Sequence, residues 1–305
     1  MNSEIKNVEK RLQKAIESND PILREASSHL LSSGGKRVRP AFVILSSQFG
    51  PQKKTEDTYR VAVALELIHM ATLVHDDVID KSDKRRGRLT IVKKWDVTTA
   101  ILTGNFLLAL GLEHLSEIRD NRIHNIISNS IVNVGLGELF QFQDQFNSEQ
   151  SITNYLRRIN RKTALLIQLA TEVGAITSEA NDETIRKLKM IGHYIGMSFQ
   201  IVDDILDFTS TEKKLGKPVG SDLMNGHITL PVLLKKKIAA LNHQSESQEF
   251  KPLIEQIRNS YSIKESKAIS DKYLAKALKL IDELDEPNAQ SLFIKLIKKM
   301  GSRSV

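Results

Sequence analysis

Two nearly identical clusters of aspartate, each at the end of a long apolar run, carry the clearest chemical signal in the sequence. They are Asp76-Asp77-Val78-Ile79-Asp80 and Asp203-Asp204-Ile205-Leu206-Asp207. Carboxylates at positions i, i+1 and i+4 of a helix repel one another, so cations are expected to offset the repulsion. Oxygen ligands without His or Cys at metal spacing are typical of Mg²⁺, which binds carboxylates together with substrate phosphates. The first and last Asp of each cluster share a helix face, and we expect them to line a shared cavity.

Three basic stretches complement these carboxylates. Residues 34–40, Gly-Gly-Lys-Arg-Val-Arg-Pro, combine a glycine turn, three cations and a proline suited to the first helical position, which predicts a phosphate site. Residues 84–88 follow the first acidic cluster and residues 213–218 follow the second, each with several Lys or Arg. Each stretch alone could be a surface loop, and each cluster a solvated helix end. Their repeated order favours a diphosphate bridged to the protein by Mg²⁺.

His69 lies seven residues before Asp76, on the same helix face. A lone helical His is more often a core or surface residue, but the shared face leads us to interpret it as a phosphate contact. No Ser-His-Asp or Cys-His pair indicates nucleophilic catalysis, and no Walker-type Gly-rich loop is present. A site of Mg²⁺, cations and apolar walls suits ionisation of a diphosphate, since the metals stabilise the leaving charge and the pocket excludes water.

Apolar residues recur at three- and four-residue spacing along most of the chain, which is the helical period. Sustained period-2 alternation and Asn-Gly or Asp-Gly hairpin turns are absent. We therefore predict an all-α fold, with one domain over 1–305 in which a helical bundle surrounds a central active-site cavity. Breaks are expected at 32–35, 181–182 and 244–247. The predicted helices are 41–49, 58–79, 97–117, 122–147, 152–177, 184–208, 228–241 and 267–300.

The composition restricts function and location. With 305 residues, a formal charge of +7 and abundant Asp and Glu, the chain does not have a nucleic-acid-binding composition. The absence of Cys excludes disulfides and thiolate metal sites. The N-terminus is polar without a signal peptide, and no apolar run is long enough to span a bilayer. We expect a cytoplasmic protein.

Over nearly its whole length the chain resembles the trans-type polyprenyl diphosphate synthases, through seven motifs that occur in the family's order. They are Gly34-Gly35-Lys36-Arg37-Val38-Arg39-Pro40; Glu66-Leu67-Ile68-His69 leading to His75 and the first Asp cluster; Arg85-Arg86-Gly87; Gly137-Glu138; Lys162-Thr163-Ala164; Phe199-Gln200-Ile201-Val202 leading to the second Asp cluster; and Gly216-Lys217-Pro218 with Gly220-Ser221-Asp222-Leu223. The resemblance implies a 1′-4 condensation. The allylic diphosphate ionises, the isopentenyl double bond attacks, and a proton is lost to the released pyrophosphate.

The resemblance also implies a role for each matching residue. Three Mg²⁺ ions would be held by Asp76, Asp80 and Asp203, with Asp77, Asp204 and Asp207 in support. The allylic diphosphate would contact Arg85, Lys162, Gln200 and Lys217. Isopentenyl diphosphate would contact Lys36, Arg39, His69 and Arg86. Thr163 and Gln200 would face the allylic cation.

Product length is expected to depend on the space beside the helix of the first acidic cluster. Short-chain members of the family place an aromatic residue four or five positions before the first Asp, where this chain has Thr72 and Ala71. An isoprene unit is about as long as one helical turn, ~5.4 Å, so a growing tail can pass this level. We expect farnesyl diphosphate as primer and an all-trans product near 35 carbons, for quinone side chains such as that of menaquinone.

A partner subunit is a further expectation. Short-chain members usually keep Gly-Lys-x-Thr where this chain has Gly226-His227-Ile228-Thr229, which resembles the two-component heptaprenyl enzymes. The chain would then be the catalytic half of a heterodimer with a small regulatory subunit. A homodimeric geranylgeranyl or octaprenyl diphosphate synthase is the alternative. Product release would bring loose peripheral contact with a membrane.

Three rival classes fit the motifs less well. A terpene cyclase shares the first Asp cluster but replaces the second and lacks the Gly-Gly-Lys-x-x-Arg-Pro motif. A phosphohydrolase of His-Asp type, suggested by His75-Asp76, needs further His ligands that are not found. A non-catalytic subunit loses its Asp clusters, whereas this chain keeps both.

Overall fold

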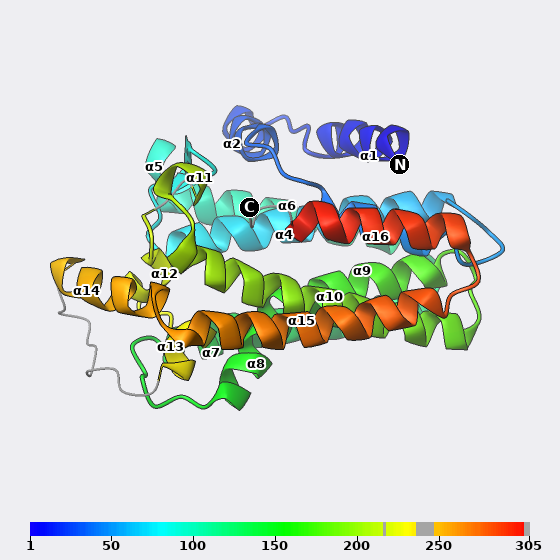
Figure 1. Cartoon of the computed structure of the whole chain (residues 1–305). Helices are drawn as coiled ribbons and strands as arrows, with labels where there is room; N and C mark the ends of the chain where they lie inside the picture. Colours follow the sequence, from blue (N-terminus) through cyan, green and yellow to red (C-terminus); the bar gives the residue numbers. More distant parts are fainter. Residues whose placement is uncertain (216–217, 236–246, 302–305) are drawn as a thin grey trace. The chain divides into compact units, whose positions relative to one another are not determined.

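The computed structural model describes residues 1–215, 218–235 and 247–301, and in these ranges the only strands belong to one short hairpin (Figure 1). The chain forms two compact units, Met1–Ile126 with Ala170–Arg186 and Ile127–Leu169 with Lys187–Val305. It passes from one to the other within α7 (Asn121–Gln143), α9 (Leu165–Ile176) and α10 (Asp182–Thr209). The predicted all-α fold class is confirmed. A single domain around a central cavity stays a prediction.

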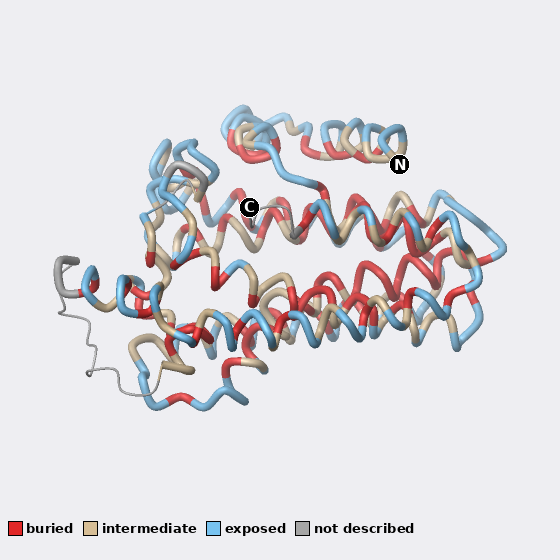
Figure 2. Tube along the Cα trace, in the orientation of Figure 1, coloured by how far each residue is buried: buried red, intermediate tan, exposed pale blue. Residues whose placement is uncertain are grey.

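The first unit contains α4 (Glu56–Ile79), which lies side by side with α6 (Val97–Ser116) (Figure 1). Every residue from 61 to 68 is buried (Figure 2), as expected for a helix that is apolar around its circumference. Gly111 lets the two helices approach, because a Cβ there would lie 3.2 Å from the carbonyl oxygen of Ala64. The other elements before α6 are α1 (Asn2–Ala15), α2 (Pro21–Ser32), α3 (Val38–Ser46), β1 (Lys84–Arg85), β2 (Arg88–Leu89) and α5 (Ile91–Lys94).

The second unit contains two apolar clusters along α10. The first joins Ile201 and Ile205 to Tyr155 of α8 (Ile152–Ile159), Ala164 of the π-helix η1 (Asn160–Ala164) and Leu230 of α13 (Leu230–Leu234). The second surrounds the fully buried Phe208 at the end of α10. The remaining elements are α11 (Glu212–Leu215), α12 (Ser221–Met224), α14 (Ser247–Arg258), α15 (Tyr261–Asp282) and α16 (Pro287–Gly301).

Most predicted helices correspond to observed ones within a few residues, but the range 267–300 is wrong as a single helix. The structure ends α15 at Asp282 and starts α16 at Pro287, because proline is favoured at the first position of a helix and disfavoured inside one. The range 152–177 comprises α8, η1 and α9. The range 228–241 contains α13, and its residues beyond 235 lie outside the described chain, as does most of the expected break at 244–247.

The longer helices α1, α2 and α14 and the four-residue helices α5, α11 and α12 are not predicted by the apolar patterns. The start of α2 nevertheless has a sequence signal: Asp20 caps it by accepting the backbone N–H of Leu23 at 2.8 Å, and Pro21 follows. None of the helices within 1–215, 218–235 and 247–301 has the length and apolar character needed to traverse a bilayer.

Candidate active site

The first acidic cluster ends α4 and is held by the hairpin that follows. Two successive residues with positive φ, Arg86 at 53° and Gly87 at 78°, make the tight turn between β1 and β2. Arg85 of β1 binds Asp77, with Nη2 2.8 Å and Nε 2.9 Å from the carboxylate oxygen Oδ1. Burial raises the pKa of the Asp77 carboxyl, and the guanidinium of Arg85 opposes that shift. The other two carboxylates of the cluster, Asp76 and Asp80, are half-buried.

A group of arginines surrounds His69, two helical turns before this cluster. The pKa of the imidazole is held well below its usual value, first by burial and then by the positive charges of Arg39, Arg86, Arg85 and Arg37. The ring is therefore neutral at pH 7 and can donate one N–H to an anion. Guanidinium groups bind phosphate oxygens through paired N–H donors, so the arginine group forms a site suited to a diphosphate.

A buried ion pair and a glycine turn build this arginine group. Arg37 takes a left-handed backbone conformation, with φ of 48°, and its Nη1 donates to Oε1 of the buried Glu66 at 3.1 Å. Gly35 lies close to the guanidinium groups of Arg86 and Arg37. A Cβ at this position would lie 2.8 Å from Nη1 of Arg86. Arg86 in turn donates to the carbonyl of Gly34. Only glycine fits at position 35 without displacing the guanidinium groups.

Arg39 is the member of the group best suited to meet an anion. Burial lowers its pKa to about 10, with the charge of Glu66 opposing the shift and that of Arg86 adding to it. The guanidinium thus stays charged at pH 7. Its Nε is buried and has no hydrogen-bond acceptor among the described residues. A buried charged N–H without a partner is costly, and an anion would relieve that cost.

The second acidic cluster, near the end of α10, is bound by neutral donors instead. Asp204 is buried and accepts hydrogen bonds from the Tyr155 hydroxyl at 2.6 Å and from Nε2 of Gln200 at 2.8 Å. Burial raises the pKa of Asp204 to about 7, although both hydrogen bonds lower it. The Thr163 hydroxyl donates to the amide oxygen of Gln200 at 2.6 Å. Three of the predicted site residues are thereby joined in one chain of hydrogen bonds.

Asp207 is buried and holds the first residues of α12. Its Oδ1 accepts from the Ser221 hydroxyl at 3.1 Å, and its Oδ2 accepts from the backbone N–H of Asp222 at 3.3 Å. The helical spacing instead predicts that Asp207 and Asp203 share a helix face and line a shared cavity. The structure leaves Asp203 as the exposed carboxylate of this cluster.

Lys162 and Thr163 lie in η1, a single π-helical turn between α8 and α9. Such turns are rare and occur frequently at functional sites. Gly196 of α10 makes room for this turn, because a Cβ there would lie 2.4 Å from the Cα of Ala164. Lys162 forms an ion pair with Glu138 at 3.0 Å, which connects two of the sequence motifs. The apolar patterns do not predict a π-helix.

The remaining predicted residues are placed as follows. Lys36 is exposed in the loop before α3, and Lys217 lies outside the described residues. Ala71 is buried, and Thr72 is half-buried, with its hydroxyl donating to the carbonyl of His69 at 2.8 Å. Tyr155 is not predicted from the sequence, where its only signal is a lone aromatic residue four positions after the cap Ser151.

The carboxylates fit Mg²⁺ but do not form a complete cage. In the described chain, no three His, Asp or Glu side chains come together as a preformed metal site. Mg²⁺ is usually held by one or two carboxylates, with water and substrate phosphates completing its shell. The solvent-accessible carboxylates of Asp76, Asp80 and Asp203 meet that requirement.

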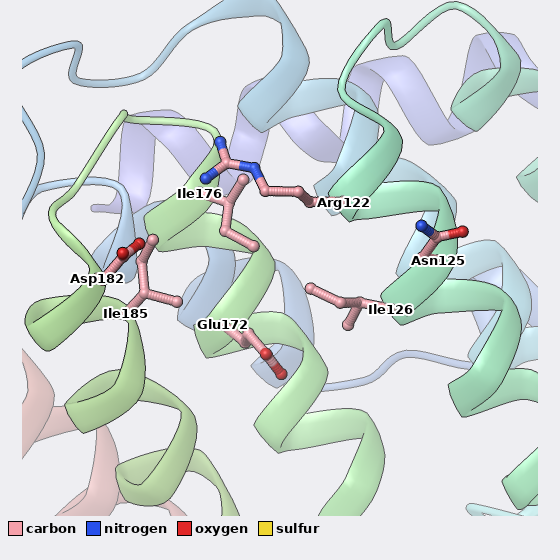
Figure 3. A pocket seen from close by; sticks show the side chains of 7 residues that line it. All are labelled: Arg122, Asn125, Ile126, Glu172, Ile176, Asp182 and Ile185. Atoms are coloured by element: carbon pink, nitrogen blue, oxygen red, sulfur yellow. The ribbon is translucent and has the colours of Figure 1, made fainter.

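A separate hollow of about 360 Å³ lies in the first unit, between the start of α7, the end of α9 and the start of α10 (Figure 3). It contains none of the predicted site residues. Charged side chains and isoleucines line it. Arg122 forms an ion pair with Asp120, with its Nη2 2.7 Å from Oδ2 of the carboxylate. The lining residues are Arg122, Asn125, Ile126, Glu172, Ile176, Asp182 and Ile185.

Several proteins similar to this chain in sequence and structure are named as prenyl diphosphate or polyprenyl synthases. The chain is 46% identical over 310 residues to heptaprenyl diphosphate synthase component 2 of Bacillus subtilis, covering 99% of this chain and 89% of that protein. It is 71% identical to a heptaprenyl diphosphate synthase from Staphylococcus aureus of known crystal structure, with a TM-score of 0.97 over 100% of this chain and 98% of that one. A polyprenyl synthase from Caulobacter crescentus, crystallised with calcium and isoprenyl diphosphate, is 26% identical, with a TM-score of 0.93 over 100% of this chain and 96% of that one. The family model for polyprenyl synthetase matches residues 20–299, and with the two acidic clusters and the arginine group in place, the chain belongs to the polyprenyl synthetase family of prenyltransferases.

Proposed function

We propose that this prenyltransferase condenses isopentenyl diphosphate with farnesyl diphosphate and extends it to an all-trans heptaprenyl diphosphate of 35 carbons. The observation that carries the proposal is the neutral His69 among four arginines, followed two turns later by the first acidic cluster. This arrangement suits a diphosphate on one side and Mg²⁺ on the other. The names of the relatives from Bacillus subtilis and Staphylococcus aureus support the product length.

Isopentenyl diphosphate would bind at the arginine group. Arg39 and Arg86 would donate to its phosphate oxygens, the neutral His69 would donate one N–H, and Lys36 would contribute a further charge from the loop. Arg37 is committed to Glu66 at 3.1 Å, so its role is to hold the loop in shape. Arg85 is bound to Asp77 at 2.8 Å, and it would reach the allylic diphosphate with its remaining donors.

The allylic diphosphate would be held by Lys162, by Lys217, which lies outside the described residues, and by Mg²⁺. The family is Mg²⁺-dependent, and we propose about three ions on Asp76, Asp80 and Asp203, with Asp77, Asp204 and Asp207 in support. Bound Mg²⁺ would stabilise the charge that develops on the leaving diphosphate. Thr163 and Gln200 would turn oxygen dipoles toward the allylic carbon as it becomes positive, and apolar walls would keep water from it.

Product length would be limited by side chains beyond Ala71 and Thr72. Because neither is bulky, the tail would pass the first turn below the acidic cluster. Replacing Ala71 or Thr72 by Phe should shorten the product to 15–20 carbons and leave the first condensation intact, at a packing cost of ~1–3 kcal/mol. Unchanged product length in both variants would place the tail elsewhere.

A small partner subunit is proposed as the other component of the enzyme, because the Bacillus subtilis relative of this chain is named as component 2 of its enzyme. The exposed apolar side chains of α6 fit a subunit interface. Val97, Ile101, Leu102 and Leu112 are 50%, 41%, 55% and 47% exposed. Exposed apolar residues repeated along one helix are unusual for a surface that faces only water.

The test is to incubate the purified chain with isopentenyl diphosphate, farnesyl diphosphate and Mg²⁺, alone and with the companion component of a heptaprenyl synthase, and to size the products. The expected result is a 35-carbon product that needs the companion. A 20- or 40-carbon product from the chain alone would favour the homodimeric alternative. No elongation under either condition would overturn the proposed function.

A further inference from the structure

Tyr155 is one of the largest fully buried side chains among the described residues, and its surroundings are apolar except for one carboxylate and one guanidinium. Its hydroxyl lies 2.6 Å from Oδ2 of Asp204, and its ring is packed among Ile159, Met197 and Ile201. An apolar site of this kind would be filled as well by phenylalanine. The hydroxyl is therefore the part of the side chain whose purpose needs explaining.

The hydroxyl begins a directed series of hydrogen bonds. Tyr155 donates to one oxygen of Asp204, and Nε2 of Gln200 donates to the other oxygen at 2.8 Å. Because the carboxylate accepts both bonds, the amide of Gln200 must turn its oxygen the other way, where it accepts the Thr163 hydroxyl at 2.6 Å. The Thr163 hydroxyl thus donates its proton to Gln200, and its oxygen lone pairs remain available to another group.

This orientation matches what an allylic cation requires. A hydroxyl whose proton is already donated presents the negative end of its dipole, which stabilises a positive carbon. If the Gln200 amide were reversed, its NH₂ group would face Thr163 and the hydroxyl could turn its proton outward. The carboxylate of Asp204 prevents that reversal only while it stays in place.

Arg158 packs its guanidinium against the ring of Tyr155. Its guanidinium lies 5.6 Å from the centre of the Tyr155 ring. The same group is buried and donates to Gln150 at 3.0 Å and to the carbonyl of Ile228 at 2.6 Å. The position of Tyr155 is therefore fixed by the packing of its ring and by the guanidinium of Arg158, which is held in turn by its hydrogen bonds to Gln150 and Ile228.

We propose that Tyr155 is a positioning residue of the allylic half-site, which acts through Asp204 to set the direction of the Gln200 amide and the Thr163 hydroxyl. The proposal rests on the proposed function, because it assigns Thr163 and Gln200 to the allylic cation. It does not require Tyr155 to touch substrate. It predicts a defect in turnover rather than in the binding of isopentenyl diphosphate.

The test is Tyr155→Phe, which removes only the hydroxyl. Tyr59→Phe is the matched control, because Tyr59 also donates to a carboxylate, that of Glu4, near the opposite end of α4 from the acidic cluster. Because the lost hydrogen bond is made to a charged group, Tyr155→Phe should lower kcat about tenfold or more. The KM for isopentenyl diphosphate should stay within about twofold, and Tyr59→Phe should leave kcat unchanged.

A double-mutant cycle separates positioning from loss of stability. If Tyr155 acts through Gln200, Tyr155→Phe should lower kcat much less in a Gln200→Ala background than in the wild type. Unchanged kcat in Tyr155→Phe, a fully additive cycle, or a loss of activity that only follows the melting temperature would each overturn the proposal. A wild-type enzyme that elongates no allylic diphosphate would instead refute the proposed function, so the two failures are distinguishable.

Discussion

The two acidic clusters have nearly the same sequence but different surroundings. In the first, the second carboxylate, Asp77, is paired with the charged guanidinium of Arg85 at 2.8 Å. In the second, the equivalent Asp204 is bound by the neutral Tyr155 hydroxyl and the Gln200 amide. A guanidinium offsets negative charge directly, whereas neutral donors offset only part of the burial cost. Burial raises the pKa of both carboxyls, and it raises that of Asp204 to about 7.

The last carboxylates of the clusters also differ. Asp80 is half-buried at the end of α4, and Asp207 is buried and tied to Ser221 and to the backbone of Asp222. The first cluster therefore presents two accessible carboxylates and the second presents one. A repeated motif gives the spacing of its side chains along the helix, but the groups packed against that helix decide which of them reach solvent.

The largest effect is expected from the first carboxylate of each cluster, which is accessible to solvent in both. Asp76→Ala and Asp203→Ala should each lower turnover by about 10²- to 10³-fold, because stabilisation of the leaving diphosphate is lost. Excess EDTA should abolish wild-type activity, and added Mg²⁺ should restore it. Steady-state rates with isopentenyl and farnesyl diphosphate provide the measurement. Near wild-type rates in either variant would show that the two clusters are not both required.

Sequence patterns and family resemblance predict the all-α fold, the family and the positions of the acidic clusters, because apolar periodicity and carboxylate spacing are local properties. They do not predict that Arg85 is bound to Asp77. That contact depends on the positive φ values of Arg86 and Gly87, which fold the hairpin back. The π-helical turn at Lys162 and the role of Tyr155 are also not predicted, because both depend on packing against residues distant in sequence.

The second prediction divides the basic residues between the two substrates. Arg39→Ala removes a guanidinium from the group around His69 and should raise the KM for isopentenyl diphosphate about 10- to 100-fold, the value of a charge-assisted hydrogen bond. Lys162→Ala, in the other unit, should raise mainly the KM for farnesyl diphosphate. Initial rates with each substrate varied in turn measure both effects. Equal changes in both constants for either variant would contradict the division.

The third prediction concerns stability and contrasts Asp207 with Asp80. Asp207→Ala leaves the Ser221 hydroxyl and the Asp222 backbone N–H without their acceptor, which should cost ~1–3 kcal/mol of unfolding free energy. Asp80→Ala, at a half-buried position, should cost ~0.5 kcal/mol or less. Urea unfolding in EDTA measures both without a contribution from metal binding. A larger loss in Asp80→Ala would reverse the contrast between the clusters.

The smallest expected effect is a pH dependence that distinguishes the surroundings of two histidines, one in each unit. The pKa of His69 is held well below its usual value by burial and four arginines, while that of His193 is lowered by burial with Lys276 as the cation acting on it. Each ring binds a proton less readily in the folded chain than in the unfolded one, where it does so below about pH 6.5. Stability therefore falls as the pH drops below that value, by up to ~1.4 kcal/mol per pH unit.

His69→Gln should therefore flatten the dependence of unfolding free energy on pH between 6.5 and 5.5 more than His193→Gln does. Pyrophosphate should reduce the wild-type slope, because an anion among the arginines offsets their charge and allows His69 to bind a proton in the folded state. Urea unfolding at several pH values, with and without pyrophosphate, gives the slopes. A slope that His69→Gln leaves unchanged would mean that this imidazole is not the group responsible for the pH dependence.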